Sequence, residues 1–280
     1  MSFLDPFPFL DRYGLQENPY STKASDRFLY ITPTHKEAIA TVAKVIRDRE
    51  GAVLVYGNYG TGKTSLMRRV YAEMRNEPKL QVCLVGDGRN CRTEYELAAQ
   101  IITGFGQVTQ SNSRTGRREQ IMRLLKENWE HGLVSILVID DAQEMPARVL
   151  RELRGYMNFE TSQERLLQIV LFAQPEIVSK KLPYAKAFRA RLWRSELKEM
   201  TRNELADMLR WRFQQAGGRV FPFEDAALDQ IFALSLGSPL SAVMLAETAL
   251  EVAAYGSGII GADLIAQAQS KVFEKGGTHG

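Results

Sequence analysis

A glycine-rich stretch beginning at Gly57 has the residue types and spacing of a phosphate-binding loop. Residues 57–64, Gly-Asn-Tyr-Gly-Thr-Gly-Lys-Thr, match the pattern G-x-x-x-x-G-K-[ST] in full. Glycines allow a tight turn whose backbone N–H groups face phosphate oxygens, and the positive end of the following helix favours the same charge. Lys63 would reach the β- and γ-phosphates, and the Thr64 hydroxyl would hold Mg²⁺. We therefore predict a nucleotide site made by Gly57, Asn58, Tyr59, Gly60, Thr61, Gly62, Lys63, Thr64 and Ser65.

Two adjacent carboxylates, Asp140 and Asp141, follow an apolar run at residues 134–139. P-loop enzymes place the acid that orders the water around Mg²⁺ at the end of such a strand. We expect Asp140 to serve the metal and Asp141 to polarise the attacking water. Another apolar run, at 167–172, ends shortly before Gln174, whose amide would touch the γ-phosphate or its water.

Residues 186–194 alternate basic and apolar side chains more densely than any other part of the chain. One interpretation is a solvated helix end. The other is an arginine finger that one subunit delivers to the γ-phosphate bound by its neighbour. The spacing favours neither interpretation. Arg189, Arg191 and Arg194 could each be the finger, and Arg189 and Arg191 are the two preferred candidates.

The elements that must position these residues alternate between strands and helices up to about residue 198. Apolar runs predict strands buried on both faces, as in a parallel sheet, at 52–56, 81–85, 134–139 and 167–172. Helical periodicity predicts helices at 35–49, 65–74, 94–105, 117–131 and 147–159, with a loop at 107–116. From Thr201 onward only helices are expected. Thr201 and Glu204 form a capping box, and three more helices cover 223–236, 239–255 and 261–273.

The composition is that of a globular protein, with 45% hydrophobic and 25% charged residues in a chain of 280. No apolar run approaches the length of a membrane span, and the first residues lack the basic and apolar regions of a signal peptide. Cys83 and Cys91 are too few for a disulfide framework or a zinc site. We therefore expect a cytoplasmic protein without a membrane role. Because the net charge is only +3, a nucleic-acid surface would have to be a local cluster.

The series of motifs resembles that of the AAA+ ATPases of the ExeA/GspA type. Tyr13-Gly14-Leu15, Asn18-Pro19-Tyr20 and residues 28–30 are similar to the opening of those proteins, and residues 140–143 and 166–176 are similar to their DEAQ and LLQIVL-GQPEL segments. The resemblance spans about residues 12–270. It implies the fold class α/β, an AAA+ P-loop NTPase core with a parallel sheet flanked by helices, followed by an all-helical lid. We expect a segment at 1–34 that packs on the nucleotide site through Asn18, Pro19 and Tyr20, a core at 35–198, a lid at 199–275 and a tail at 276–280.

Without a membrane helix, the chain looks more like the transposon regulators of the TnsC, TniB and MuB sort. That resemblance implies a homo-oligomer, ring or filament, that needs ATP and Mg²⁺, binds double-stranded DNA and serves a transposase and target-selection proteins. It also favours Arg189 over Arg191 as the finger. The loops that face DNA in those relatives correspond here to Arg89, Asn90, Arg92, Ser113, Arg114, Arg117 and Arg118. Merely solvated charge is the competing interpretation of these residues.

Two departures from the family pattern bear on catalysis. Asp141 stands where the family has glutamate, and Leu240 stands where the lid has arginine. We therefore expect nucleotide binding with slow hydrolysis. The alternative function is an ExeA/GspA-like ATPase that assists assembly of a secretion or envelope machine without binding DNA. An initiator-like or helicase-loading ATPase is less favoured, because no winged-helix segment follows the expected lid.

Overall fold

The computed structural model describes residues 8–23, 27–161, 164–256 and 258–276. Their contacts divide the chain into two compact units, an α/β unit and a helical unit. The α/β unit comprises Pro33–Asn58 and Lys63–Leu197, and the helical unit comprises the described residues of Met1–Thr32, Tyr59–Gly62 and Lys198–Gly280. Of the predicted tail, residues 277–280 lie outside the described part of the chain, and Gly276 ends the last helix.

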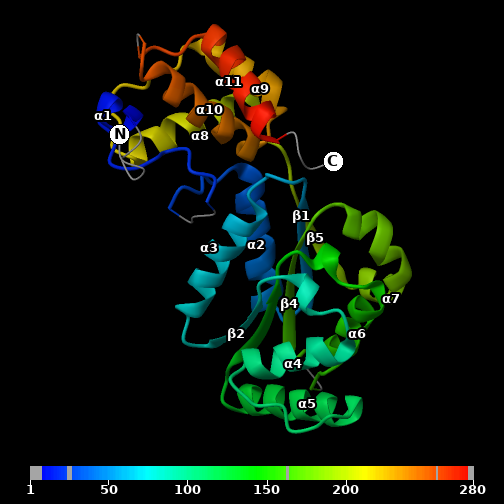
Figure 1. The fold of residues 1–280 in the computed structure, drawn as a ribbon. Helices are drawn as coiled ribbons and strands as arrows, with labels where there is room; N and C mark the ends of the chain where they lie inside the picture. Colours follow the sequence, from blue (N-terminus) through cyan, green and yellow to red (C-terminus); the bar gives the residue numbers. More distant parts are fainter. Residues whose placement is uncertain (1–7, 24–26, 162–163, 257, 277–280) are drawn as a thin grey trace. The chain divides into compact units, whose positions relative to one another are not determined.

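Five parallel strands form the sheet of the α/β unit, in the order β2-β3-β4-β1-β5 (Figure 1). Their bounds are β1 Ala52–Gly57, β2 Leu80–Val85, β3 Val134–Ile139, β4 Leu167–Ala173 and β5 Leu192–Leu197. The four strands expected from apolar runs are confirmed. Strand β5 was not predicted: it forms an edge of the sheet, exposes Trp193, Arg194 and Glu196, and so lacks a continuous apolar run.

Helices cover both faces of this sheet, with α2 and α3 along one face and α4 to α7 along the other (Figure 1). Their bounds are α2 Pro33–Arg47, α3 Lys63–Arg75, α4 Glu94–Gly104, α5 Arg114–Glu130, α6 Ala147–Met157 and α7 Lys186–Arg189. Short helical turns are η1 Gly88–Asn90, η2 Ala142–Glu144, η3 Ile177–Lys181 and η4 Leu182–Ala185. Every residue of β4 is buried, as a central strand between two helical layers requires. The expected loop at 107–116 was too long, because Ser113 caps α5 and the helix begins at Arg114.

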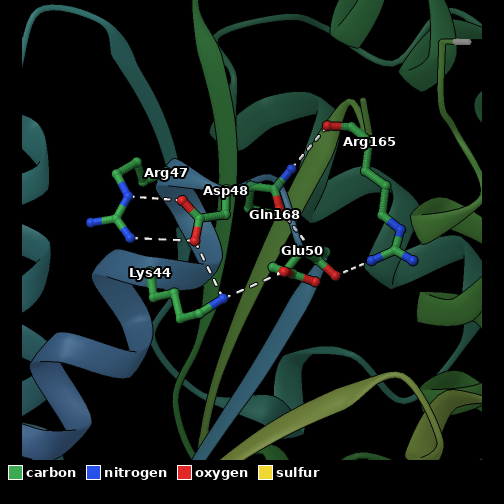
Figure 2. Close-up of polar contacts among 7 residues, drawn as sticks. Lys44, Arg47, Asp48, Glu50, Arg165 and Gln168 are labelled. Carbon is green, nitrogen blue, oxygen red and sulfur yellow. Dashed lines mark hydrogen bonds and ion pairs between the residues drawn. The ribbon is translucent and has the colours of Figure 1, made fainter. Parts of the chain in front are cut away.

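A polar cluster lies at the amino-terminal ends of β1 and β4 (Figure 2). The fully buried Gln168 accepts a hydrogen bond from Gly51 N at 2.8 Å and donates to Arg165 O at 2.9 Å. Arg165 donates in turn to Glu50 O. These bonds join the start of β4 to the start of β1, and so fix the register of the strand that leads into the loop.

The helical unit contains α1 Pro8–Tyr13, α8 Arg202–Gln215, α9 Asp225–Ser235, α10 Pro239–Ala253 and α11 Ala262–Gly276. The capping box predicted at Thr201 and Glu204 is present at the start of α8. The segment after α1 packs into the core of this unit, where Tyr20 is fully buried and its hydroxyl donates to Leu209 O at 3.0 Å. Among the described residues, no helix is both long and apolar enough to cross a membrane.

Candidate nucleotide-binding site

The glycine-rich loop leaves the carboxyl end of β1 and leads directly into α3, which begins at Lys63. Gly60 and Gly62 have φ of 84° and 92°, a left-handed conformation that glycine adopts without steric cost. Within the helical unit, Leu240 N donates to Gly60 O at 3.3 Å, and a Cβ at Gly60 would lie 2.7 Å from Ser238 Oγ. A side chain at Gly60 is therefore excluded by packing as well as by backbone geometry.

Lys63 points its ammonium group back at the loop. Its Nζ donates to Gly57 O at 2.8 Å and to Asn58 O at 2.7 Å, and the residue is only 8% exposed. Burial lowers the pKa of Lys63, whereas the charges of Asp140, Asp141 and Glu176 raise it. The Lys63 ammonium group thus lies against two carbonyl oxygens, and the acidic groups are close enough to raise its pKa.

Asp140, at the end of β3, is 3% exposed. Burial raises its pKa, while hydrogen bonds from Asp141 N and from the Thr64 hydroxyl, and the charge of Lys63, lower it. The hydroxyl and carboxylate therefore meet, and these two oxygen ligands fit the chemistry of Mg²⁺. When bound, the ion would be held by Thr64 and Asp140 and would neutralise charge on the phosphates.

Asp141 takes a left-handed backbone conformation, with φ 49° and ψ 41°, which aspartate tolerates better than most residues. Its Oδ1 accepts a hydrogen bond from Gln143 Nε2 at 2.9 Å. The turn also packs tightly, because a Cβ at Gly88 would lie 2.4 Å from Asp141 O. The Asp141 carboxylate is thus held by a hydrogen bond within the turn that follows β3, and its charge raises the pKa of Asp140.

Gln174 directly follows β4. Together with Asn58 it borders a pocket of about 440 Å³ in the α/β unit, lined by Tyr56, Asn58, Gln174, Pro175, Glu176, Val178 and Ser179. Because the carboxyl ends of neighbouring parallel strands meet at one edge of the sheet, the structure brings Lys63, Thr64, Asp140, Asp141 and Gln174 to that edge.

The two candidate finger arginines differ in their contacts. Arg191 Nη1 donates to Asn158 Oδ1 at 2.9 Å. Arg189 ends α7 and is exposed, and within the described residues its side chain forms no hydrogen bond or ion pair. Neither residue belongs to the group around Lys63, so a role as a finger in another subunit stays a prediction.

Asn18, Pro19 and Tyr20 lie in the helical unit, where each has a structural contact. Asn18 Nδ2 donates to Glu247 Oε1 at 2.5 Å, and Pro19 O accepts from Arg212 Nε at 2.7 Å. Their predicted contact with the nucleotide stays a prediction.

The residues predicted to contact DNA fall into two groups. Several are engaged inside the α/β unit: Ser113 caps α5, and Arg114 pairs with Glu94 at 2.9 Å and with Glu152. Arg117 donates to Ser111 O and Tyr95 O, both at 2.8 Å, and Arg118 donates to Gly155 O and stacks over Phe159 at 4.8 Å.

The other group, Arg89, Asn90 and Arg92, is exposed at and just after η1. Arg89 pairs with Asp87 at 2.9 Å. A further exposed arginine, Arg148 of α6, donates to Arg92 O at 3.1 Å and so lies beside this group.

Two residues of the site were missed as functional candidates. Gln143 donates a hydrogen bond to Asp141, and the charge of Glu176 raises the pKa of Lys63. Both stand inside motifs that the sequence analysis noted, the segment at 140–143 and the Gln-Pro-Glu at 174–176. The motifs gave a signal for both residues. The bond between Gln143 and Asp141 lies within one turn, whereas the effect of Glu176 on Lys63 joins segments that follow different strands and could not be inferred from spacing.

Comparisons with known proteins agree with this geometry. Residues 46–180 match the family described as AAA domain. The chain is 30% identical over 249 residues to general secretion pathway protein A of Aeromonas hydrophila, an alignment that covers 88% of this chain and 45% of that protein. The chain thus matches less than half the length of this relative.

Solved structures share the fold at low identity. Cdc6p of Pyrobaculum aerophilum gives a TM-score of 0.65 at 16% identity, covering 91% of this chain and 70% of that one. The Aeropyrum pernix ORC1 protein, solved in complex with DNA, gives 0.63 at 18% identity, covering 88% of this chain and 67% of that one.

The five-stranded parallel sheet with its glycine-rich loop and flanking helices is the fold of an α/β P-loop core, and residues 46–180 within it match the AAA domain family. Over the 249 aligned residues, the sequence is similar to general secretion pathway protein A.

Proposed function

We propose that the α/β unit binds ATP with Mg²⁺ and hydrolyses it slowly. The observation that carries this proposal is the meeting of the Thr64 hydroxyl with the Asp140 carboxylate beside the buried Lys63 ammonium. Lys63 would bind the phosphates, Asp141 would accept a hydrogen bond from the attacking water, and Gln174 would orient that water. Asp141 is one methylene shorter than the glutamate of the resembled family, which is why turnover is proposed to be slow.

Lys63→Ala tests the site. Removing a charge-assisted contact with phosphate should weaken ATP binding about tenfold to a hundredfold, as measured by titration with a fluorescent ATP analogue. Lys181→Ala is a matched control, since Lys181 Nζ donates to Met145 O away from the loop. Equal ATP affinity of wild type and Lys63→Ala would remove the assignment.

We further propose that the chain binds double-stranded DNA as an ATP-dependent oligomer and regulates transposition by recruiting or activating a transposase. Support comes from the resemblance to transposon regulators and from the exposed group at η1. Of the residues considered for DNA, Arg117 and Arg118 serve internal contacts, so we place the phosphate contacts mainly on Arg89, Arg92 and Arg148. Contacts of this kind position DNA without reading its sequence.

Changing Arg92 and Arg148 together to glutamine should weaken DNA binding equally on unrelated duplexes. The slope of log affinity against log salt should become shallower by about 0.9 for each phosphate that the variant no longer neutralises. Arg47→Gln is the control, because Arg47 is a surface arginine that pairs with Asp48 at the opposite end of the sheet (Figure 2). An unchanged salt slope in the double variant would contradict the placement of the phosphate contacts on Arg92 and Arg148. Absence of DNA binding by the wild type would contradict the DNA role itself.

The 30% identity to general secretion pathway protein A favours a second function. In that case the chain would assist the assembly of a secretion or envelope machine and would have no DNA role. Co-purification with membrane components, together with no ATP-dependent binding to duplex DNA at low salt, would favour it over transposition.

A further inference from the structure

A single amide side chain joins the two strand ends that carry the proposed catalytic groups. Gln143 lies in η2, two residues after Asp141, and is 7% exposed. Its Nε2 donates to Asp141 Oδ1 at 2.9 Å, and its Oε1 accepts from Gln174 N at 3.0 Å. The carboxylate that follows β3 is thereby tied to the backbone that follows β4.

Both hydrogen-bonding groups of the Gln143 amide are used, one as donor and one as acceptor. Within the described residues, Gln143 is the one hydrogen-bond partner of the Asp141 carboxylate. Oδ1 accepts this bond, whereas Oδ2 accepts none from the described residues and is free to accept from a water. The backbone partner matters as well, since Gln174 directly follows the fully buried strand β4, and close packing restricts the movement of that strand.

We propose that Gln143 is a positioning residue, which fixes the Asp141 carboxylate relative to β4 so that Oδ2 meets the water attacking the γ-phosphate. This inference rests on the proposed hydrolysis of ATP by the same site. A carboxylate free to rotate would spend less time in the reactive geometry, so the loss of Gln143 would slow the chemical step without weakening ATP binding.

Two substitutions separate the donor from the acceptor. Gln143→Met keeps the length of the side chain and removes both bonds. Gln143→Glu keeps an acceptor for Gln174 N, removes the donor and sets a second carboxylate against Asp141. Both variants should lower kcat about tenfold or more and leave the Kd for ATP within about twofold of wild type. If Gln143→Glu turned over like wild type, the bond to Asp141 would not be the important one and the proposal would fail.

A double-mutant cycle tests whether Gln143 acts through Asp141. Asp141→Asn combined with Gln143→Met should be no slower than Asp141→Asn alone, because the group being positioned is already lost. If the double variant were slower by the product of the two single-variant rate reductions, Gln143 would act independently of Asp141 and the inference would be overturned. If Gln143→Met fails to fold, Gln143→Ala completes the same cycle, because it also removes both bonds and adds no charge.

The rate of ATP hydrolysis by the wild-type chain distinguishes a failure of the proposed function from a failure of the proposed role of Gln143. A wild-type chain that binds ATP but never hydrolyses it contradicts the proposed function itself. Measurable wild-type hydrolysis with unchanged kcat in both Gln143 variants contradicts only the role of Gln143.

Discussion

At the scale of single residues, the length of the Asp141 side chain controls the rate that we propose for hydrolysis. Asp141→Glu should raise the single-turnover rate about tenfold, because a carboxylate one methylene longer reaches further toward the water. Rapid-quench measurement with excess protein over ATP isolates this step from product release. Asp141→Asn, which removes the charge and keeps the size, should lower the rate. A slower Asp141→Glu variant would show that the length of the carboxylate does not limit the chemistry.

The two cysteine thiols offer a test of burial at the same scale. Burial raises the pKa of Cys83 from 9.0 to about 12 and that of Cys91 from 9.0 to about 11. The thiolate is the reactive form, so both thiols should resist alkylation near neutral pH in the native chain and react after unfolding.

The sign of the linked pH effect on stability follows from these raised pKa values. The folded state keeps its thiol protons when the unfolded chain releases them, so this contribution to stability is complete below about pH 9 and is lost as the pH rises toward 12. Replacing both cysteines with alanine should flatten the alkaline decline of the unfolding free energy. Rapid labelling of the native chain would contradict the buried positions.

At the scale of elements, a buried arginine holds the amino-terminal segment on α8. Arg212 Nε donates to Pro19 O at 2.7 Å and Nη2 donates to Ser21 O at 2.9 Å, and burial lowers the pKa of Arg212 to about 10. Arg212→Met should leave these two carbonyl groups without their donors, and the helical unit should lose about 2–3 kcal/mol of stability.

Urea denaturation measures this loss, and limited proteolysis should show earlier cleavage between α1 and α2. Arg212→Lys is the matched comparison, because lysine keeps the charge but lacks the planar group that serves both carbonyls. It should recover only part of the stability. An Arg212→Met variant as stable and as resistant to protease as wild type would contradict the anchoring role.

At the scale of the whole molecule, the proposed oligomer needs a group that one subunit can offer to another. Arg189 is exposed and has no hydrogen bond or ion pair within the described residues, whereas Arg191 is bonded to Asn158. Arg189→Ala should therefore leave ATP binding nearly unchanged, abolish assembly with an ATP analogue on duplex DNA, and lower ATP turnover about a thousandfold.

Electron microscopy and sedimentation velocity measure this assembly directly. Arg191→Ala is the control, since it removes only a local bond and should assemble as wild type does. Rings or filaments of Arg189→Ala that match those of wild type would rule out Arg189 as the finger. A reversed result, with Arg191→Ala unable to assemble, would transfer the role to Arg191.

The sequence alone determined four of the strands, the position of the glycine-rich loop after β1, the two carboxylates after β3 and the capping box at Thr201. These features depend on local patterns, because a loop motif, an apolar run or a capping box is contained within a few neighbouring residues. The edge strand β5 escaped prediction, since an exposed strand carries no continuous apolar run.

Only the tertiary structure decided which polar groups meet across the sheet and between distant segments. Gln143 and Gln174 are separated by 31 positions, and Arg212 and Pro19 by 193. The arginines of α5 were predicted to face DNA from their type and spacing, and this stays a prediction. The structure adds that Arg117 donates to Tyr95 O and that Arg118 donates to Gly155 O. The topology of the chain brings such partners together, and the spacing of residues along the sequence does not show which distant residues will be close in space.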